Sequence, residues 1–307
     1  MCECNAIVKI PPLGRDARIG SVFNHIFSIM YQTEQTDTSD GKKVIWDFSQ
    51  CHSLHPFFLS ALSILKQGYG DIVSLRDINP EISDYLNSVY FHSPLVIYPI
   101  ENDKSIWQKY DDKSYLPICS FCPYDSSSVK VQELVQTTIK HQLPKERKLH
   151  GVLSLILSEL IDNITEHSNS NQGFVFCHTY PSDKTLYVVI SDTGRSIFAS
   201  YASDERYSSS LTNKESSGLL LALSGKSTKD RPENENRGYG ISRSRGLIVN
   251  GLGGEFYILS GSAFVRYDSN GESVADLPED YRWNGTLILL KIPTGITNDF
   301  DIYQYIS

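Results

Sequence analysis

The sequence has no long apolar run. None of its stretches approaches the roughly 18 uninterrupted apolar residues of a membrane-spanning helix, so we expect no transmembrane segment. The N-terminal residues MCECNAIVKIPP also lack the apolar core of a secretory signal peptide. Both absences lead us to expect a cytoplasmic protein.

Basic charge is scarce as well. The chain has 28 Lys and Arg against 36 Asp and Glu, a formal balance of 28 − 36 = −8, and it has no long basic run. Because nucleic acids and anionic lipids attract positively charged surfaces, we expect neither nucleic acid nor membrane as a partner. The 307 residues are enough for about two domains.

Cysteine is also sparse, with six residues in the whole chain. In the cytosol they are expected to be reduced. The pairs Cys2-x-Cys4 and Cys119-x-x-Cys122 have the composition of a four-thiolate zinc site. Nothing around them resembles a tight metal knuckle, so zinc is the minor alternative. We expect Cys51 and Cys177, which lie near predicted strands, in the core.

The most informative segment is LHGVLSLILSELIDNITEHS, residues 149–168, where Glu159, Asn163 and His167 stand four residues apart. Four residues advance a helix by about 400°, so these side chains share one side of it. The amide oxygen suits a hard cation, and the carboxylate suits a general base or a ligand for water. The alternative is an ordinary solvated helix face.

Two strands are predicted next, GFVFCHTY at 173–180 and KTLYVVISD at 184–192. The second runs into Asp192-Thr193-Gly194, where an aspartate accepts a hydrogen bond from a ligand amine and a glycine allows close backbone approach. By itself this motif is more often a turn.

A long polar stretch, 195–236, indicates a mobile lid with a short helix at 219–223. It closes on Arg237-Gly238-Tyr239-Gly240-Ile241 and an amphipathic helix. Glycines at the start of a helix expose N–H groups that bind phosphate, and Arg237 and Arg243 add charged donors.

The last motif is Gly285-Thr286, at the entrance to the strand LILLKIP.

These four motifs together resemble those of the Bergerat-fold ATPases, which include histidine kinases, gyrase, heat-shock chaperones, mismatch-repair proteins and anti-sigma-factor kinases. That family carries E-x-x-x-N on a helix, D-x-G-x-G after a strand, a lid, G-x-G-[LI] and a late G-T, in this order. The resemblance covers about residues 130–295. The closest branch is that of the anti-sigma-factor kinases, which resembles this chain from VQELVQ through E-x-x-x-N-x-x-x-H.

The resemblance implies ATP and Mg²⁺ as cofactors. Asn163 would ligate Mg²⁺, Glu159 would be the general base, and Asp192 would bind the adenine amino group. The remaining implied nucleotide-binding residues are Gly194, Ser227, Thr228, Arg237, Gly238, Gly240, Ile241 and Thr286.

Two positions qualify this picture. Ser196 replaces the second glycine of D-x-G-x-G, which bears on the path of the lid's first turn. His167 matches a histidine common in the kinase branch, but a histidine near a helix end more often caps or packs than catalyses, and we expect that of His167.

The first half has a βα-like alternation, with predicted strands at 4–10 and 42–51, a further apolar segment at 71–78, and predicted helices at 19–32, 55–67 and 82–91. The V-I-W-D-F-S turn into an apolar helix resembles the STAS domain of anti-sigma-factor antagonists, over about 40–100. Ser53 is out of register with the serine that those antagonists phosphorylate, so no such site is carried over. An unrelated small α/β domain is the alternative.

We therefore predict an α/β (α+β) protein. Its parts are an N-terminal STAS-like domain (1–105), a linker (106–130) and a C-terminal histidine kinase-like ATPase domain (131–307), a sandwich with a mixed sheet and an ATP lid. The leading hypothesis is a Mg-ATP-binding regulatory switch that binds a protein partner and hydrolyses ATP slowly or not at all. The alternatives are a serine/threonine kinase of the anti-sigma type and a non-enzymatic module with a degenerate ATP site. The kinase branch is compatible with a homodimer.

Overall fold

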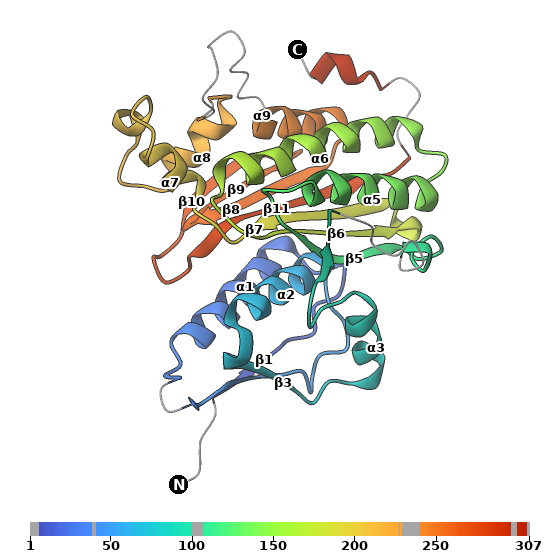
Figure 1. Ribbon diagram of the computed structural model, residues 1–307, viewed down its shortest axis with the longest axis vertical. Coiled ribbons are helices and arrows are strands. Elements are labelled where there is room, and N and C mark those ends of the chain that lie inside the picture. The colour runs from blue at the N-terminus through green and yellow to red at the C-terminus, as the bar shows by residue number, and fades with distance from the viewer. Residues whose placement is uncertain are drawn as a thin grey trace. The chain divides into compact units, whose positions relative to one another are not determined.

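The computed structural model describes residues 6–38, 41–99, 107–226, 228, 240–295 and 300–305. The chain divides into two compact units, Met1–Leu95 and Val96–Ser307 (Figure 1). Helices and sheets occur in both, so the fold class is mixed α/β, as the sequence predicts.

Within the described part of the first unit, the strands form a parallel sheet in the order β1-β2-β3. Parallel strands need crossover connections, and here helices supply them. The expected strands and helices are confirmed, with bounds β1 Ala6–Lys9, α1 Ile19–Glu34, β2 Val44–Asp47, α2 Pro56–Tyr69, β3 Val73–Arg76 and α3 Pro80–Ser88.

The start of α2 has an ordinary cap. Pro56 stands in its first turn, and the His55 ring accepts a hydrogen bond from the Phe57 N–H at 3.2 Å. Phe57 and Phe58 are both buried. The turn before α2 is therefore built around a histidine cap and buried aromatic rings, and no serine opens the helix.

The second unit is built on one long sheet. Among the described residues its strand order is β10-β9-β8-β11-β7-β6-β5-β4, and neighbours run antiparallel from β10 through β5. The bounds are β4 Leu95–Ile97, β5 Tyr115–Phe121, β6 Gly173–Tyr180, β7 Thr185–Asp192, β8 Glu255–Gly261, β9 Ala263–Asp268, β10 Gly271–Asp276 and β11 Trp283–Pro293. The strands expected at 173–180 and 184–192 are confirmed.

The segment predicted as a linker, 106–130, differs in the structure. Residues Tyr115–Phe121 form β5, which pairs with β6, and α5 already begins at Ser127. The charged, Pro- and Ser-containing composition suggests a connection, but β5 itself reads YLPICSF and is mostly buried. A short apolar strand inside a polar stretch is easily missed when composition is averaged.

Helices α5 (Ser127–Gln142), α6 (Arg147–His167) and α9 (Gly240–Arg245) cover one face of this sheet (Figure 1). The core lies between them and the strands. Alternate residues of β6, β7 and β11 enter it, among them Val175, Val188, Ile190, Ile288 and Leu290. The two-residue period of the strands and the apolar stripe of α6 together place this core.

The expected lid region contains α7 (Ile197–Ala202), a 3₁₀ turn at Ser208–Ser210 and α8 (Ser216–Leu223). The short helix predicted at 219–223 is thus confirmed within α8. After α9 the chain continues as a π-helical turn, Gly246–Gly251, and a glycine-rich loop into β8.

Candidate functional site

Helix α6 is amphipathic, as its sequence predicts. Its apolar residues are buried, whereas Asn163 and His167 line the edge of a pocket. The polar stripe is thus not simply a solvated face. The buried apolar residues of α6 are Leu149, Val152, Leu153, Ile156, Leu157, Leu160, Ile161 and Ile164.

The pocket gathers residues from distant parts of the sequence. Several of the predicted nucleotide-binding residues line it, although they belong to α6, β7, α9, β11 and the segment after α8. They are Asn163, Asp192, Thr228, Gly240, Ile241 and Thr286. The structure therefore brings these six positions to one place.

Asn163 faces the first residue of α9. A β carbon added at Gly240 would lie 3.2 Å from Asn163 Nδ2 and 3.0 Å from Glu159 Oε2. Among the described residues, Asn163 Nδ2 is buried without a hydrogen-bond partner. A buried polar group without a partner is costly, so it marks a place where a ligand is expected.

Glu159 is engaged by α9. Arg243 Nη1 donates a hydrogen bond to Glu159 Oε1 at 3.1 Å, with the two side chains 20% and 24% exposed. Glu159 does not line the pocket; it lies beside Gly240 at the pocket's edge. The expected base is therefore held as one partner of an ion pair.

Asp192 ends β7 and is 2% exposed. Its Oδ1 accepts a hydrogen bond from the Gly194 N–H at 2.8 Å. Burial raises the pKa of this carboxyl to about 7, while hydrogen bonds from the backbone N–H groups of Gly194 and Thr286 act in the opposite direction. Asp192 therefore sits near the midpoint of its titration at neutral pH.

Gly285 allows β11 to approach Asp192. Its φ is +88°, and an added β carbon would lie 2.5 Å from Asp192 Oδ1 and 2.4 Å from the Asp192 carbonyl oxygen. A register shift against β8 falls between Trp283 and Thr286. The glycine of the G-T pair thus has a physical reason, because no side chain fits here.

Thr286 stands directly across from Asp192 in the sheet. Its Oγ1 lies 3.0 Å from Ser260 Oγ, and Ser260 also accepts a hydrogen bond from the Ile197 N–H at 2.8 Å. Ser260 on β8 therefore joins β11 to the start of α7. The sequence analysis missed Ser260, whose only signal is a hydroxyl at the end of an apolar strand.

Gly194 follows Asp192 by two residues and packs against the end of α6. An added β carbon would lie 2.0 Å from the Ser168 carbonyl oxygen, which accepts a hydrogen bond from the Arg195 N–H at 2.7 Å. Gly194 itself does not line the pocket. Its place in the structure is to let the turn after β7 cross the end of α6.

Ser196, which stands where the Bergerat-fold ATPases that the sequence resembles have a second glycine, is the N-cap of α7. Its Oγ accepts a hydrogen bond from the Ala199 N–H at 3.2 Å, and its side chain is buried. The backbone at Ser196 is extended, with φ −67° and ψ 159°, and does not require a glycine. The substitution is therefore accommodated by helix capping.

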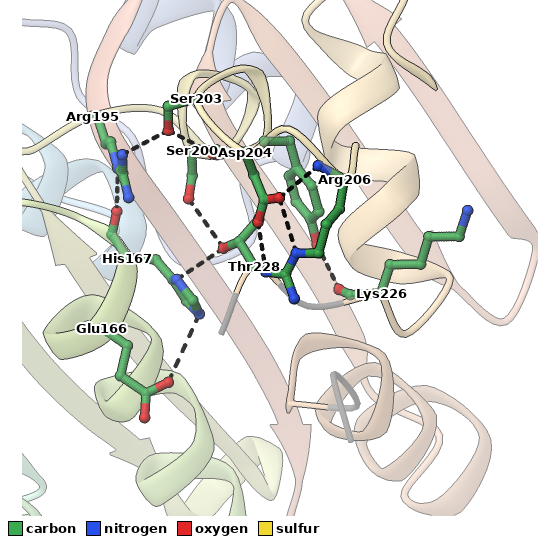
Figure 2. A network of polar contacts seen from close by, with 10 residues as sticks. Glu166, His167, Arg195, Ser200, Ser203, Asp204, Arg206, Lys226 and Thr228 are labelled. Carbon is green, nitrogen blue, oxygen red and sulfur yellow. Dashed lines mark hydrogen bonds and ion pairs between the residues drawn. The ribbon is translucent and has the colours of Figure 1, made fainter. Parts of the chain in front are cut away.

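The segment after α8 is tied to α6 and α7. Thr228 Oγ1 lies 3.0 Å from His167 Nδ1 and 3.3 Å from Ser200 Oγ, and Figure 2 shows the imidazole pointing at Thr228. Tyr201 donates a hydrogen bond to the Lys226 carbonyl oxygen at 2.6 Å. The expectation that His167 packs or caps differs from the structure, because its ring lines the pocket and contacts a hydroxyl.

Two cations at this pocket were not singled out from the sequence. Arg195 donates from Nε to the His167 carbonyl oxygen at 2.6 Å and from Nη1 to Ser203 Oγ at 3.0 Å. Lys226 lines the pocket as well. Their signals were the residue after Asp-x-Gly and a lysine between a glycine and two hydroxyl residues, GKST.

Some predicted positions lie outside the described residues. These are Ser227, Arg237 and Gly238 of the predicted nucleotide site, and Cys2 and Cys4 of the cysteine pairs. Cys119 is buried, and its burial raises the pKa of the thiol well above the usual value, which disfavours a metal-binding thiolate. Cys51 and Cys177 are buried, as expected.

No model of a known protein family matches the chain, and a comparison with curated proteins also finds no match. Among the described residues, no helix is both long and apolar enough to cross a bilayer.

Proposed function

We propose that this protein is a Mg-ATP-binding regulatory protein whose nucleotide site lies in the pocket of the second unit. The observation that carries the proposal is that Asn163, Asp192, Gly240 and Thr286 line this one pocket. They come from four separate motifs of the Bergerat-fold resemblance. A chance similarity between short motifs gives no reason for their residues to meet.

The chemistry of the lining supports an adenine nucleotide. A carboxylate at Asp192 accepts a hydrogen bond from an exocyclic amine, and the close approach of Gly285 fixes its position. Apolar residues such as Ile164, Ile190 and Ile288 line the same pocket and suit the flat base. Arg195, which also lines the pocket, brings positive charge for phosphates.

The residues also fit a magnesium ion. Asn163 offers an amide oxygen, and its amide nitrogen is buried without a partner among the described residues. Mg²⁺ takes oxygen ligands and keeps several waters, so one protein ligand beside nucleotide phosphates is enough. The bound ion would neutralise phosphate charge; Asn163 would position it, and Glu159 would orient water nearby.

We infer that the protein acts as a nucleotide-gated switch. The segment from Arg195 to Thr228 is anchored at the pocket through contacts of His167, Ser200 and Tyr201. A nucleotide bound in the pocket would therefore change the conformation of this segment. The surface that changes would then bind a protein partner. We expect a cytoplasmic location, with the STAS-like resemblance of the first unit favouring a partner in anti-sigma-type regulation.

The second candidate function is that of a nucleotide-binding protein that hydrolyses little or no ATP. The ion pair of Glu159 with Arg243 favours it, because a carboxylate held by a guanidinium must leave that partner before it can orient water or take a proton. Binding and turnover are therefore separate questions. A serine/threonine kinase of the anti-sigma type needs Glu159 to be released from this pair.

Calorimetry with ATP and ADP, each with and without Mg²⁺, tests the proposal. We expect ATP to bind in a magnesium-dependent way and the Asp192→Ala variant to lose binding while keeping its far-UV spectrum. Binding of neither nucleotide by the folded protein would refute the proposal. If ATP does bind, a partner protein that is captured only by the ATP-bound form would support the role as a switch.

A further inference from the structure

A row of polar side chains begins at the wall of the pocket, which His167 and Thr228 line. Thr228 Oγ1 lies 3.0 Å from His167 Nδ1, and on the far side of the ring Glu166 Oε2 lies 3.8 Å from Nε2 (Figure 2). A hydroxyl, an imidazole and a carboxylate thus follow one another in space. This order is the one in which a hydroxyl group is activated as a nucleophile.

The position of Thr228 is held from several sides. Its hydroxyl contacts Ser200 Oγ at 3.3 Å as well as the imidazole, and two residues earlier the Lys226 carbonyl oxygen accepts a hydrogen bond from Tyr201 at 2.6 Å. Ser200 and Tyr201 both belong to α7 and are buried. The hydroxyl of Thr228 therefore faces the pocket from a built site.

The end of α6 is fixed in the same way. Arg195 binds the His167 carbonyl oxygen through Nε at 2.6 Å and Ser203 through Nη1 at 3.0 Å. His167 itself lines the pocket together with Asn163, one helical turn earlier. The imidazole and the Thr228 hydroxyl that it contacts therefore both line the pocket that we propose for the nucleotide.

We propose that Thr228 is a site of self-phosphorylation, with His167 as its general base. The inference rests on the proposed function, since the phosphoryl donor is a nucleoside triphosphate in this pocket. Thr228 Oγ1 forms a bond to the terminal phosphorus, and the bond from that phosphorus to the β–γ bridging oxygen breaks. The nucleoside diphosphate leaves with that oxygen.

The proton balance uses the groups already in place. The hydroxyl proton passes to His167 Nδ1, and the imidazolium that forms is stabilised by the Glu166 carboxylate beside Nε2. The products are phosphothreonine and nucleoside diphosphate. This route does not need Glu159, which the structure engages with Arg243.

Phosphorylation would change the local contacts. A phosphate at Thr228 carries about −1.5 to −2 charges and three acceptor oxygens, so it can no longer share its position with the imidazole and Ser200 as a neutral hydroxyl does. Arg195 is a nearby cation that lines the pocket, whereas the Lys226 ammonium extends away toward the Tyr207 ring (Figure 2). Phosphorylation of Thr228 would therefore change the conformation of the segment from Arg195 to Thr228, which we propose as the switch.

The test uses the full-length protein with magnesium and ATP labelled at the terminal phosphate. We expect one labelled residue, Thr228, by peptide mass spectrometry. Thr228→Val abolishes the label, whereas Thr228→Ser keeps it. Label on any other residue, or an unlabelled protein that binds Mg-ATP by calorimetry, overturns the inference and leaves the proposed function standing. Absence of nucleotide binding refutes both.

The role of His167 has its own controls. His167→Gly slows labelling at least about 100-fold, the usual contribution of a general base, and added imidazole restores a measurable part of the rate. Asp162→Gly, which puts the same glycine at an exposed position of α6 but removes no base, stays within a few-fold of the parent. Equal losses in both variants without rescue by imidazole indicate a merely structural role and contradict the proposal.

A second readout needs no nucleotide. The proposal requires Nδ1 of His167 to accept the Thr228 hydrogen bond, so the neutral ring carries its proton on Nε2. Nitrogen-15 NMR of the imidazole in the nucleotide-free protein distinguishes the two tautomers, and Thr228→Val should shift the Nδ1 signal. A ring protonated on Nδ1 in its neutral form overturns the base role.

Discussion

Arg243 on α9 donates a hydrogen bond to Glu159 on α6, with Nη1 and Oε1 3.1 Å apart. The pair joins the helix that carries the acidic motif to the helix that follows the glycine motif. It also restrains the carboxylate that the Bergerat resemblance assigns as general base. Under the proposed function, the rate of ATP turnover would therefore depend on whether this pair opens when nucleotide binds.

The first prediction concerns Glu159. Glu159→Ala should retain Mg-ATP binding and lose turnover of ATP, because the carboxylate orients water but does not line the pocket. Calorimetry and phosphate release measure the two effects separately. The matched control is Asp162→Ala, which removes the same charge from the exposed side of α6. A full rate of phosphate release in Glu159→Ala would remove it as the base.

The second prediction concerns Asn163. Asn163→Ala should abolish the magnesium-dependent part of ATP binding and leave the fold intact, because its side chain is half-buried at the pocket and its amide oxygen is the proposed ligand of Mg²⁺. Titration with ATP in the presence and absence of Mg²⁺ measures this difference. If the affinity for Mg-ATP equals that of the parent protein, Asn163 does not hold the ion.

The third prediction follows from the protonation of Asp192. In the ionised carboxylate of Asp192 both oxygens are free of a proton and can accept a hydrogen bond from the adenine amine, whereas in the protonated acid one oxygen carries the proton. The pKa of this buried acid is about 7. Affinity should therefore fall as the pH drops below 7, approaching about tenfold per pH unit. Adenosine serves as the ligand, since it has no phosphate to titrate. A flat profile between pH 6 and 8 would contradict this role for Asp192.

The same shift predicts a stability effect. The pKa of Asp192 is raised from 3.8 to about 7 in the folded state, so the folded protein binds more protons than the unfolded chain between these values. The free energy of unfolding thus decreases as the pH rises through this window. Asp192→Asn should be more stable than the parent at pH 8, by on the order of a few kcal/mol, and nearly equal to it near pH 4. Urea unfolding at both pH values measures the difference.

The fourth prediction compares two glycines with positive φ. Gly285→Ala should destabilise the protein by roughly 2–4 kcal/mol, because its β carbon would collide with Asp192. Gly271→Ala is the control: its φ is +111°, but the space around it is open, so only the backbone strain of about 1 kcal/mol remains. Equal losses at the two positions would show that contact with Asp192 is not what selects a glycine.

The fifth prediction addresses Ser196 and the alternative of a degenerate site. Ser196→Gly introduces the glycine that the resembled Bergerat-fold motif has here, and it should leave nucleotide affinity unchanged, because the serine caps α7 in an extended backbone conformation. It should cost a few tenths of a kcal/mol in stability, whereas Ser196→Ala should cost about 1 kcal/mol. A clear gain in ATP affinity with glycine would instead favour a site weakened by the serine.

The helices and strands were largely predictable because their signals are local. The apolar stripe of α6, the Val- and Tyr-rich β7 and the short helix α8 all appear in the sequence within a few residues of their bounds. Strand β5 was not predicted, because YLPICSF lies in a polar stretch and its partner β6 follows only after two helices. Pairing across that distance is decided by the sheet as a whole.

The candidate site divides in the same way. The sequence by itself determined which residues carry acidic, amide and glycine functions and the order in which they follow, since these depend on residue type and spacing. Only the tertiary structure decided that Asn163, Asp192, Gly240 and Thr286 meet in one pocket, that Asp192 is buried enough to raise its pKa, and that His167 faces Thr228. Desolvation and contacts between distant segments arise only when the chain has folded, so neither can be predicted from a local sequence pattern.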